Sequence, residues 1–237
     1  KNGKTIAFVG DSHNLTLMKS QKMAFDMGNN LINYSFNGCP FPYPQNGLKP
    51  KECDQFLKIA TDKILNSLSK NDFVVIYNYH LSHLGDKSLR DVRHNFFDEK
   101  GNLPTKGEVK FEIYKNALIE FSKKAEKRGI EIILVGATIR NNLLEISRKE
   151  WFRPFPPTYV LNEEKRNAKN LNNKFKESLK NIKNIKFIDS IDVMKCCSDM
   201  DEYNIYFRLG DTDHLSEFGA KTLMNRILFF ISNKNKE

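Results

Sequence analysis

The stretch from Ile6 to His13 reads IAFVGDSH: four apolar residues, then a glycine, an acid, a serine and a histidine. A short, continuous apolar run of this kind is typical of a strand buried on both faces of a parallel sheet. Ser12 follows the strand directly, and α/β sheets collect their functional residues at the carboxyl ends of their strands. Ser12 is therefore either a helix cap or a nucleophile held out by the sheet, and the far end of the chain helps to decide between these two roles.

Around this stretch, β-rich runs alternate with helical patterns, which predicts βα units, a parallel sheet and an α/β fold. The absence of an internal repeat or a low-complexity linker predicts one domain over residues 1–237. In the helix expected over 53–70, the periodicity turns Phe56, Ile59, Ile64 and Leu68 inward. The predicted strands are 5–10, 31–36, 72–79, 130–138 and 185–190, and the predicted helices are 15–28, 53–70, 112–129, 162–179 and one that follows an N-cap at Ser216.

Composition narrows the classes of protein that the chain can belong to. Hydrophobic residues make up 40% of the 237, and no apolar run approaches the roughly 20 residues that a membrane span needs. The net charge is +9, but the lysines are interleaved with Glu and Asn on helix-like segments, so we expect a solvated face and no nucleic-acid partner. Because the chain begins with Lys1 and not Met, we expect a processed product or a piece excised from a longer protein, from which a signal peptide or a membrane-spanning portion could have been removed.

The four cysteines bear on the compartment. Cys39 and Cys53 bracket a Pro/Gly-rich loop, which a disulfide would stabilise by roughly 3 kcal/mol for a loop of this length. Cys196 and Cys197 could bond to each other or to the first two, so the connectivity stays open. No CxxC pair is present, which argues against structural zinc, and we expect no metal or other cofactor. Disulfides favour an extracytoplasmic location, either periplasmic or at the cell surface.

The segment GDTDHLSEFGA, residues 210–220, supplies a base for Ser12. A serine hydroxyl is a weak nucleophile unless an adjacent base takes its proton, and His214 can play this part. Asp211, three residues earlier, can fold back to accept the Nδ1 proton of the imidazole and fix its tautomer. Asp213 is the alternative acid, but as the neighbour of His214 it is expected to point elsewhere.

An acyl-transfer site also needs donors aimed at the developing oxyanion. The backbone N–H of Ser12 is one candidate. Gly38, in SFNGCP after the second strand, is another, because a glycine lets its backbone approach the substrate. The side-chain amide of Asn78, near the end of the third strand, is a third.

In this order along the chain, GDSH, NGC and DTDHLS resemble blocks I, II and V of the SGNH/GDSL hydrolase superfamily. The resemblance implies a three-layer α/β/α sandwich with a flavodoxin-like parallel sheet, and a triad of Ser12, Asp211 and His214. The block III pattern Gly-x-Asn is not matched, since IYNYH has Tyr where Gly is expected, which puts the oxyanion role of Asn78 in doubt. GDSH, GCPFP, EWFRP and DTDHLSEFGA are most similar to SGNH domains fused to membrane acyltransferase-3 domains, a family that O-acylates cell-surface polysaccharides.

Several other residues could have either a functional or a structural role. His13 could touch substrate or face away. His80 and His83 have the i, i+3 spacing of a metal pair, but without an evident third ligand a structural role is favoured. Trp151 and Arg153 could form a sugar platform, or Trp151 could anchor its loop in the core. We expect the segments 80–106 and 137–160 to position the acceptor.

The function expected is a serine-dependent O-acyltransferase that moves an acyl group, most simply acetyl, onto a polysaccharide hydroxyl. The family implies that the acyl donor comes from a membrane acyltransferase domain, and the isolated chain is expected to be monomeric. An esterase acting on carbohydrate or small esters is the first alternative. A catalytically silent glycan-binding module is the second, although such a module has no need of all three triad residues.

Overall fold

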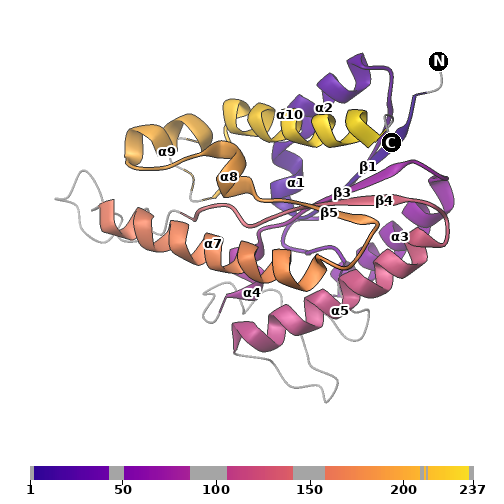
Figure 1. Cartoon of the computed structure of the whole chain (residues 1–237), viewed down its shortest axis with the longest axis horizontal. Helices are drawn as coiled ribbons and strands as arrows, with labels where there is room; N and C mark the ends of the chain where they lie inside the picture. Colours follow the sequence, from indigo (N-terminus) through magenta and orange to yellow (C-terminus); the bar gives the residue numbers. More distant parts are fainter. Residues whose placement is uncertain are drawn as a thin grey trace.

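A computed structural model describes residues 3–42, 51–85, 106–140, 158–208, 211 and 213–234, without the side chains of 158–160 and 200. Its centre is a five-stranded sheet in which every pairing is parallel. The strand order is β2-β1-β3-β4-β5, which is the flavodoxin-like order, so the predicted α/β class and sheet are confirmed (Figure 1). The strands are β1 (Thr5–Gly10), β2 (Asn30–Ser35), β3 (Phe73–Tyr77), β4 (Glu131–Val135) and β5 (Ile185–Ile188).

Helices cover both faces of this sheet, which completes the expected three layers (Figure 1). One layer holds α1 (Ser12–Thr16), α2 (Met18–Asp26), α8 (Ser190–Met194), α9 (Met200–Tyr206) and α10 (Glu217–Asn233). The other holds α3 (Lys51–Ser67), α4 (His80–Leu84), α5 (Gly107–Glu126) and α7 (Thr158–Leu179). The predicted N-cap of the last helix is confirmed, since Ser216 Oγ accepts a hydrogen bond from the backbone N–H of Gly219.

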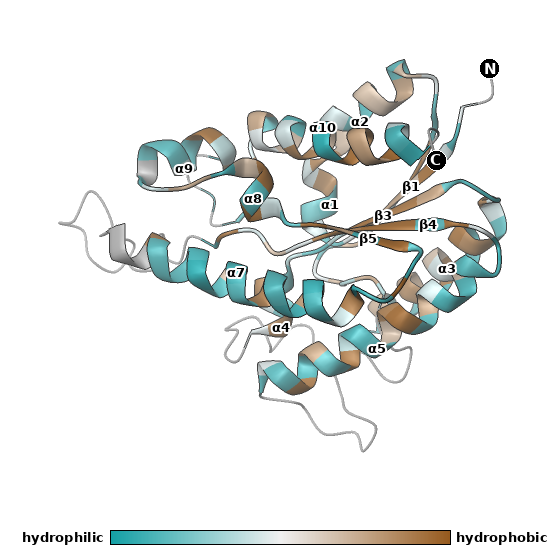
Figure 2. Cartoon of the chain, in the orientation of Figure 1, coloured by the Kyte–Doolittle hydropathy of each residue, from teal (hydrophilic) through white to brown (hydrophobic). Residues whose placement is uncertain are grey.

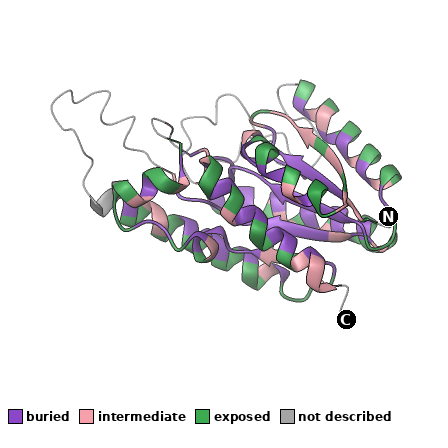
Figure 3. Cartoon of the chain, turned by 90° about the horizontal axis from the view of Figure 1, so that it is seen from above, coloured by how far each residue is buried: buried purple, intermediate pink, exposed green. Residues whose placement is uncertain are grey.

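The core lies between the sheet and the two helix layers. All five residues of β3 are buried, as a central parallel strand requires, and β3 and β4 are mainly hydrophobic (brown) in Figure 2. The helices turn buried faces to the sheet and exposed faces to solvent (Figure 3). Among the helices that the structure describes, none has the length and apolar character needed to cross a bilayer.

Helix α3 corrects one detail of the predicted core. Ile64 and Leu68 are buried as expected and Phe56 is partly buried, but Ile59 is 56% exposed. The buried stripe runs instead through Leu57 and Ala60, because the helix is rotated relative to the face that we read from the sequence.

Two disulfides are present in the structure. Cys39 is bonded to Cys53, which ties the segment after β2 to the first turn of α3 and confirms the expected bridge. Cys196 is bonded to its neighbour Cys197, between α8 and α9, which was the pairing left open. All four cysteines are buried.

Candidate active site

The chain turns sharply at the end of β1 to present Ser12. A side chain on Gly10 would collide with the backbone carbonyl of Tyr77 on the neighbouring strand β3, so the close approach requires glycine. Asp11 then caps helix α1 by accepting a hydrogen bond from the backbone N–H of His13 at 2.8 Å. Ser12 is therefore the first residue of α1, at the carboxyl edge of the sheet.

The last helix brings a histidine to this serine from the other end of the chain. His214 Nε2 lies 2.9 Å from Ser12 Oγ, and both side chains belong to partly exposed residues. On the other side of the ring, His214 Nδ1 lies 2.9 Å from Asp211 Oδ2. With the proton on Nδ1, the ring donates to the carboxylate, and Nε2 is left to accept the proton of the serine hydroxyl.

Asp213 also faces the ring, and the expectation that it points elsewhere is wrong. Its Oδ1 lies 3.1 Å from His214 Nδ1, and its side chain is buried whereas that of Asp211 is partly exposed. The reason is a tight turn in which the backbone N–H groups of Asp213 and His214 both donate to Asp211 Oδ1. This turn folds the two carboxylates toward the same edge of the imidazole.

These carboxylates set the proton affinity of the base. The hydrogen bond to Asp213 is the largest influence and raises the pKa of His214, burial opposes it, and Asp211 adds to the rise. A raised pKa makes the histidine a stronger base and stabilises the imidazolium formed when it takes a proton. Ser12, His214 and the two acids can thus generate an oxygen nucleophile.

A buried hydrogen-bond network, which we did not anticipate from the sequence, supports the turn that carries Ser12. Asp11 accepts hydrogen bonds from the backbone N–H of Tyr79 at 2.8 Å and from His83 Nε2 at 2.7 Å. Burial opposes ionisation of Asp11, but His83, His13 and the Tyr79 N–H more than offset it and lower the pKa of Asp11 to about 2. The sequence feature that could have predicted this contact is the position of His83 just beyond β3, because β3 pairs with β1 and the ends of the two strands are adjacent.

The structure does not support contact between His13 and a substrate. The residue is fully buried. Its ring stacks on Tyr79 with centroids 4.5 Å apart and lies 5.2 Å from the ring of His214. Burial lowers the pKa of His13, and its ring packs beneath the site.

The oxyanion role expected of the Asn78 side chain is also wrong. Asn78 is fully buried, and its amide nitrogen donates to the carbonyl of Phe41 at 2.7 Å and to the hydroxyl of Tyr114 at 3.0 Å. Its carbonyl oxygen accepts from the Phe41 N–H. One amide proton holds the segment after β2 and the other bonds Tyr114 on α5, so neither is left for a substrate oxygen.

Gly38 stays a candidate oxyanion donor on its position alone. It lies in a turn three residues beyond the end of β2, with φ of 74°, a conformation that favours glycine. The pairing of β2 with β1, which sets Ser35 opposite Gly10, puts this turn at the same edge of the sheet as Ser12.

His80 and His83 do not act as a metal pair. His80 is buried, its Nε2 donates to the carbonyl of Val135 at 3.0 Å, and burial lowers its pKa to about 3, while His83 serves Asp11. Within the described residues, one group has ligand atoms close enough together to hold a metal ion: Asp211, Asp213 and His214. The hydrogen bonds of the two carboxylates to His214 Nδ1 already account for this clustering. Trp151 and Arg153 lie outside the described residues, so their proposed part in sugar binding stays a prediction.

Known structures share this fold at low sequence identity. A protein of Slackia heliotrinireducens assigned to the SGNH hydrolases matches with a TM-score of 0.59 and 14% identity, covering 98% of each chain. A Bacteroides fragilis protein assigned as an acylhydrolase has a TM-score of 0.57 and 16% identity, covering 99% of this chain and 89% of its own. A GDSL-like lipase of Bacteroides thetaiotaomicron has a TM-score of 0.53 and 12% identity, with 98% and 89% covered.

A search of curated protein sequences found no match. The family model described as "SGNH domain (fused to AT3 domains)" matches residues 1–229, nearly the whole chain. Together with the parallel sheet, this match shows that the chain belongs to the family of SGNH domains that are fused to AT3 domains.

Proposed function

We propose that residues 1–237 form one catalytic domain, a serine-dependent O-acyltransferase that transfers an acyl group, most simply acetyl, to a hydroxyl of a cell-surface polysaccharide. The observation that carries the proposal is the 2.9 Å separation of Ser12 Oγ and His214 Nε2, with carboxylates on the opposite side of the ring. Triads are recognised by geometry and roles of this kind and not by sequence position.

In the first step, Ser12 Oγ attacks the carbonyl carbon of the acyl donor as its proton passes to His214 Nε2. Asp211 and Asp213 stabilise the imidazolium, and we assign the backbone N–H groups of Ser12 and Gly38 to the oxyanion of the tetrahedral intermediate. The imidazolium then gives its proton to the leaving group, and the acyl group stays on Ser12 as an ester.

In the second step, the same histidine works on the acceptor. His214 takes the proton of a sugar hydroxyl as that oxygen attacks the acyl-Ser12 carbonyl. When the tetrahedral intermediate collapses, the bond to Ser12 Oγ breaks, and the imidazolium returns its proton to the serine. The products are an O-acylated sugar and the free hydroxyl of Ser12.

The family supports the wider setting of this reaction. Because its members are SGNH domains fused to AT3 domains, we propose that a membrane acyltransferase domain supplies the acyl donor and tethers this domain outside the cytoplasm. The two disulfides agree with an oxidising compartment.

Hydrolysis is the second candidate activity, because the side chain of His214 is 22% exposed and water can reach the reacting atoms. If water replaces the sugar in the second step, the same residues make an esterase. Solved proteins named as an acylhydrolase and a GDSL-like lipase have this fold, which is compatible with that outcome.

Hydrolysis of p-nitrophenyl acetate by wild type and by Ser12→Ala tests the serine chemistry. We expect the variant to lose about 10³-fold or more in kcat/KM and to form no acetyl-enzyme detectable by mass spectrometry. Ser198→Ala, which removes an exposed serine hydroxyl elsewhere, is the matched control. Turnover that survives in Ser12→Ala would overturn the proposal, and acetylated oligosaccharide in the product mixture would distinguish transferase from esterase.

A further inference from the structure

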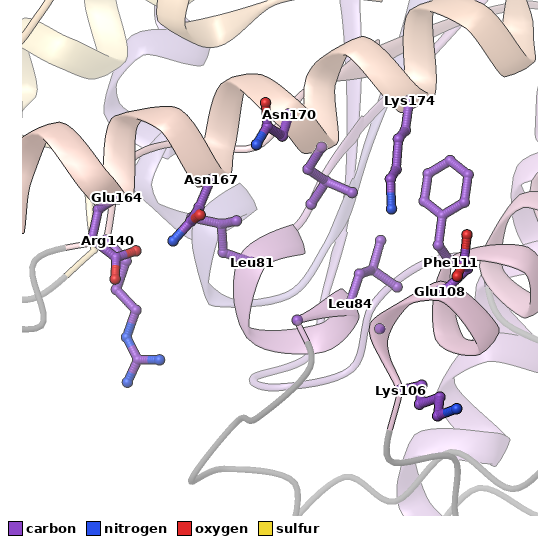
Figure 4. A pocket seen from close by; sticks show the side chains of 13 residues that line it. Leu81, Leu84, Lys106, Glu108, Phe111, Arg140, Glu164, Asn167, Asn170 and Lys174 are labelled. Carbon is purple, nitrogen blue, oxygen red and sulfur yellow. The ribbon is translucent and has the colours of Figure 1, made fainter.

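A concave site lies between helices α4, α5 and α7, in the helix layer opposite to the one that holds α1 and α10 (Figure 1). Its volume of about 470 Å³ is in the range of pockets that hold small ligands. Leu81 and Leu84 of α4 form one wall, Phe111 of α5 another, and one face of α7 a third (Figure 4). None of the triad residues lines it.

Polar side chains from α7 dominate one wall of this pocket. Glu164, Asn167, Asn170 and Lys174 recur at helical spacing, so they share one face of α7. Figure 4 shows Asn167 and Lys174 pointing from α7 into the space that Leu81 and Phe111 also line. The wall therefore combines amides, which both donate and accept hydrogen bonds, with a cation close to apolar surface.

The charges in the pocket favour a ligand with negative groups. Three cations, Lys106, Arg140 and Lys174, face two carboxylates, Glu108 and Glu164. Arg140 and Glu164 have further interactions within the chain. We therefore assign the ligand contacts to other residues: Asn167 and Asn170 to hydroxyl groups and Lys174 to an anionic group.

Helix α4 connects this pocket to the nucleophile. Leu81 and Leu84 line the pocket, while His83 on the same helix donates to Asp11, the residue before Ser12. A helix with its side chains is about 10 Å across, so about one helix width separates the pocket from Asp11.

We propose that this pocket binds an acidic oligosaccharide segment of the acceptor, a few sugar units away from the hydroxyl that is acylated. The inference rests on the proposed function, because it names the acceptor class for the same enzyme. A lining rich in amides and charges suits sugar hydroxyls and carboxylates, whereas an acyl chain would need a mainly apolar pocket. Lys174 offers an ammonium group for a sugar carboxylate, and Phe111 offers an apolar surface for a sugar ring.

Equilibrium binding to the Ser12→Ala variant of the full 237-residue chain tests the site without turnover. The probes are a tetramer of galacturonic acid and a neutral tetramer of galactose, titrated by calorimetry. We expect the acidic tetramer to bind more tightly, and Lys174→Ala to raise its dissociation constant about tenfold. Lys169→Ala on the same helix is the matched control, because it removes an exposed lysine that does not line the pocket and should leave the constant unchanged.

The outcomes separate this inference from the proposed function. Equal losses in Lys174→Ala and Lys169→Ala, equal affinity for the two tetramers, or no binding of either would overturn the acidic oligosaccharide site. Hydrolysis of p-nitrophenyl acetate by wild type reports the serine chemistry independently of the pocket. Loss of binding with intact hydrolysis therefore refutes this inference alone, and binding as expected without Ser12-dependent turnover refutes the proposed function alone.

Discussion

Replacement of Asp211 and Asp213 by asparagine, singly and together, measures how two carboxylates share one histidine. The two carboxylates lie at similar distances from His214 Nδ1: Asp211 Oδ2 at 2.9 Å and Asp213 Oδ1 at 3.1 Å. At 3 Å, a carboxylate stabilises an imidazolium by about 1.4 kcal/mol if it is screened as in bulk water, and this corresponds to about tenfold in rate. Asp213 is buried and less screened, so its removal should cost more than that of Asp211, up to about 100-fold.

The double variant should cost at least the product of the single losses, and up to about tenfold more. In each single variant the remaining carboxylate still accepts the Nδ1 proton and holds the tautomer that leaves Nε2 free for Ser12. With both carboxylates gone, no anionic acceptor remains there, and we expect a loss of about 10³- to 10⁴-fold in kcat. Asparagine keeps a carbonyl oxygen that can accept the backbone hydrogen bonds made by Asp211 Oδ1, so the turn should persist.

Steady-state hydrolysis of p-nitrophenyl acetate is the assay, with thermal melting to verify folding and Asp201→Asn, an exposed acid on α9, as the control. The idea that both carboxylates accept the Nδ1 proton would be refuted if Asp211→Asn alone lost as much activity as the double variant. A silent Asp211→Asn beside a fully inactive Asp213→Asn would equally refute it and would make Asp213 the sole acid of the triad.

Three further outcomes follow from the same contacts. The pKa of His214 is raised above 6.5, and the neutral form of this residue is the base. We therefore expect kcat/KM to fall as the pH drops through an apparent pKa above 6.5. A pH–rate profile whose acid limb lies below 6.5 would contradict this expectation. His83→Ala removes the side-chain partner of the buried Asp11 carboxylate and leaves it only the backbone N–H groups of His13 and Tyr79, so urea unfolding should show a loss of about 3 kcal/mol that His83→Gln partly restores. Equal losses in the two variants would count against a contribution from the His83 hydrogen bond. Dithiothreitol should lower the melting temperature of wild type but not that of a Cys39→Ala/Cys53→Ala variant, since closing this loop contributes about 3 kcal/mol; identical responses would assign the effect to another bond.

The parts of the fold that depend on local pattern could be predicted from the sequence. Strand β1 has the predicted ends, because a buried apolar run stops at a glycine. Ser216 is the predicted cap because its role needs only the N–H groups of the next turn. The proximity of Ser12 and His214 could also be anticipated, since GDSH follows a buried strand and DTDHLS precedes the last helix, in the order typical of the SGNH blocks.

The parts that depend on distant partners could not be predicted in this way. Asn78 has the residue type of an oxyanion donor, but its amide is consumed by Phe41, 37 residues away, and no local pattern reveals that contact. The partnership of Asp11 with His83, 72 residues apart, depends in the same way on how two strand ends meet. His13 shows the same limit, since burial beneath the site is a property of tertiary packing.

The two reacting side chains of the candidate site are separated by 202 residues of sequence. Ser12 belongs to the first helix and His214 immediately precedes the last one, and α10 packs against α2 near the beginning of the chain. During synthesis the serine is therefore made early but stays without its base until the final helix has emerged and docked. A chain that stops before α10 should fail to assemble the pair even if its sheet forms, so the appearance of esterase activity would report completion of folding at the C-terminal end.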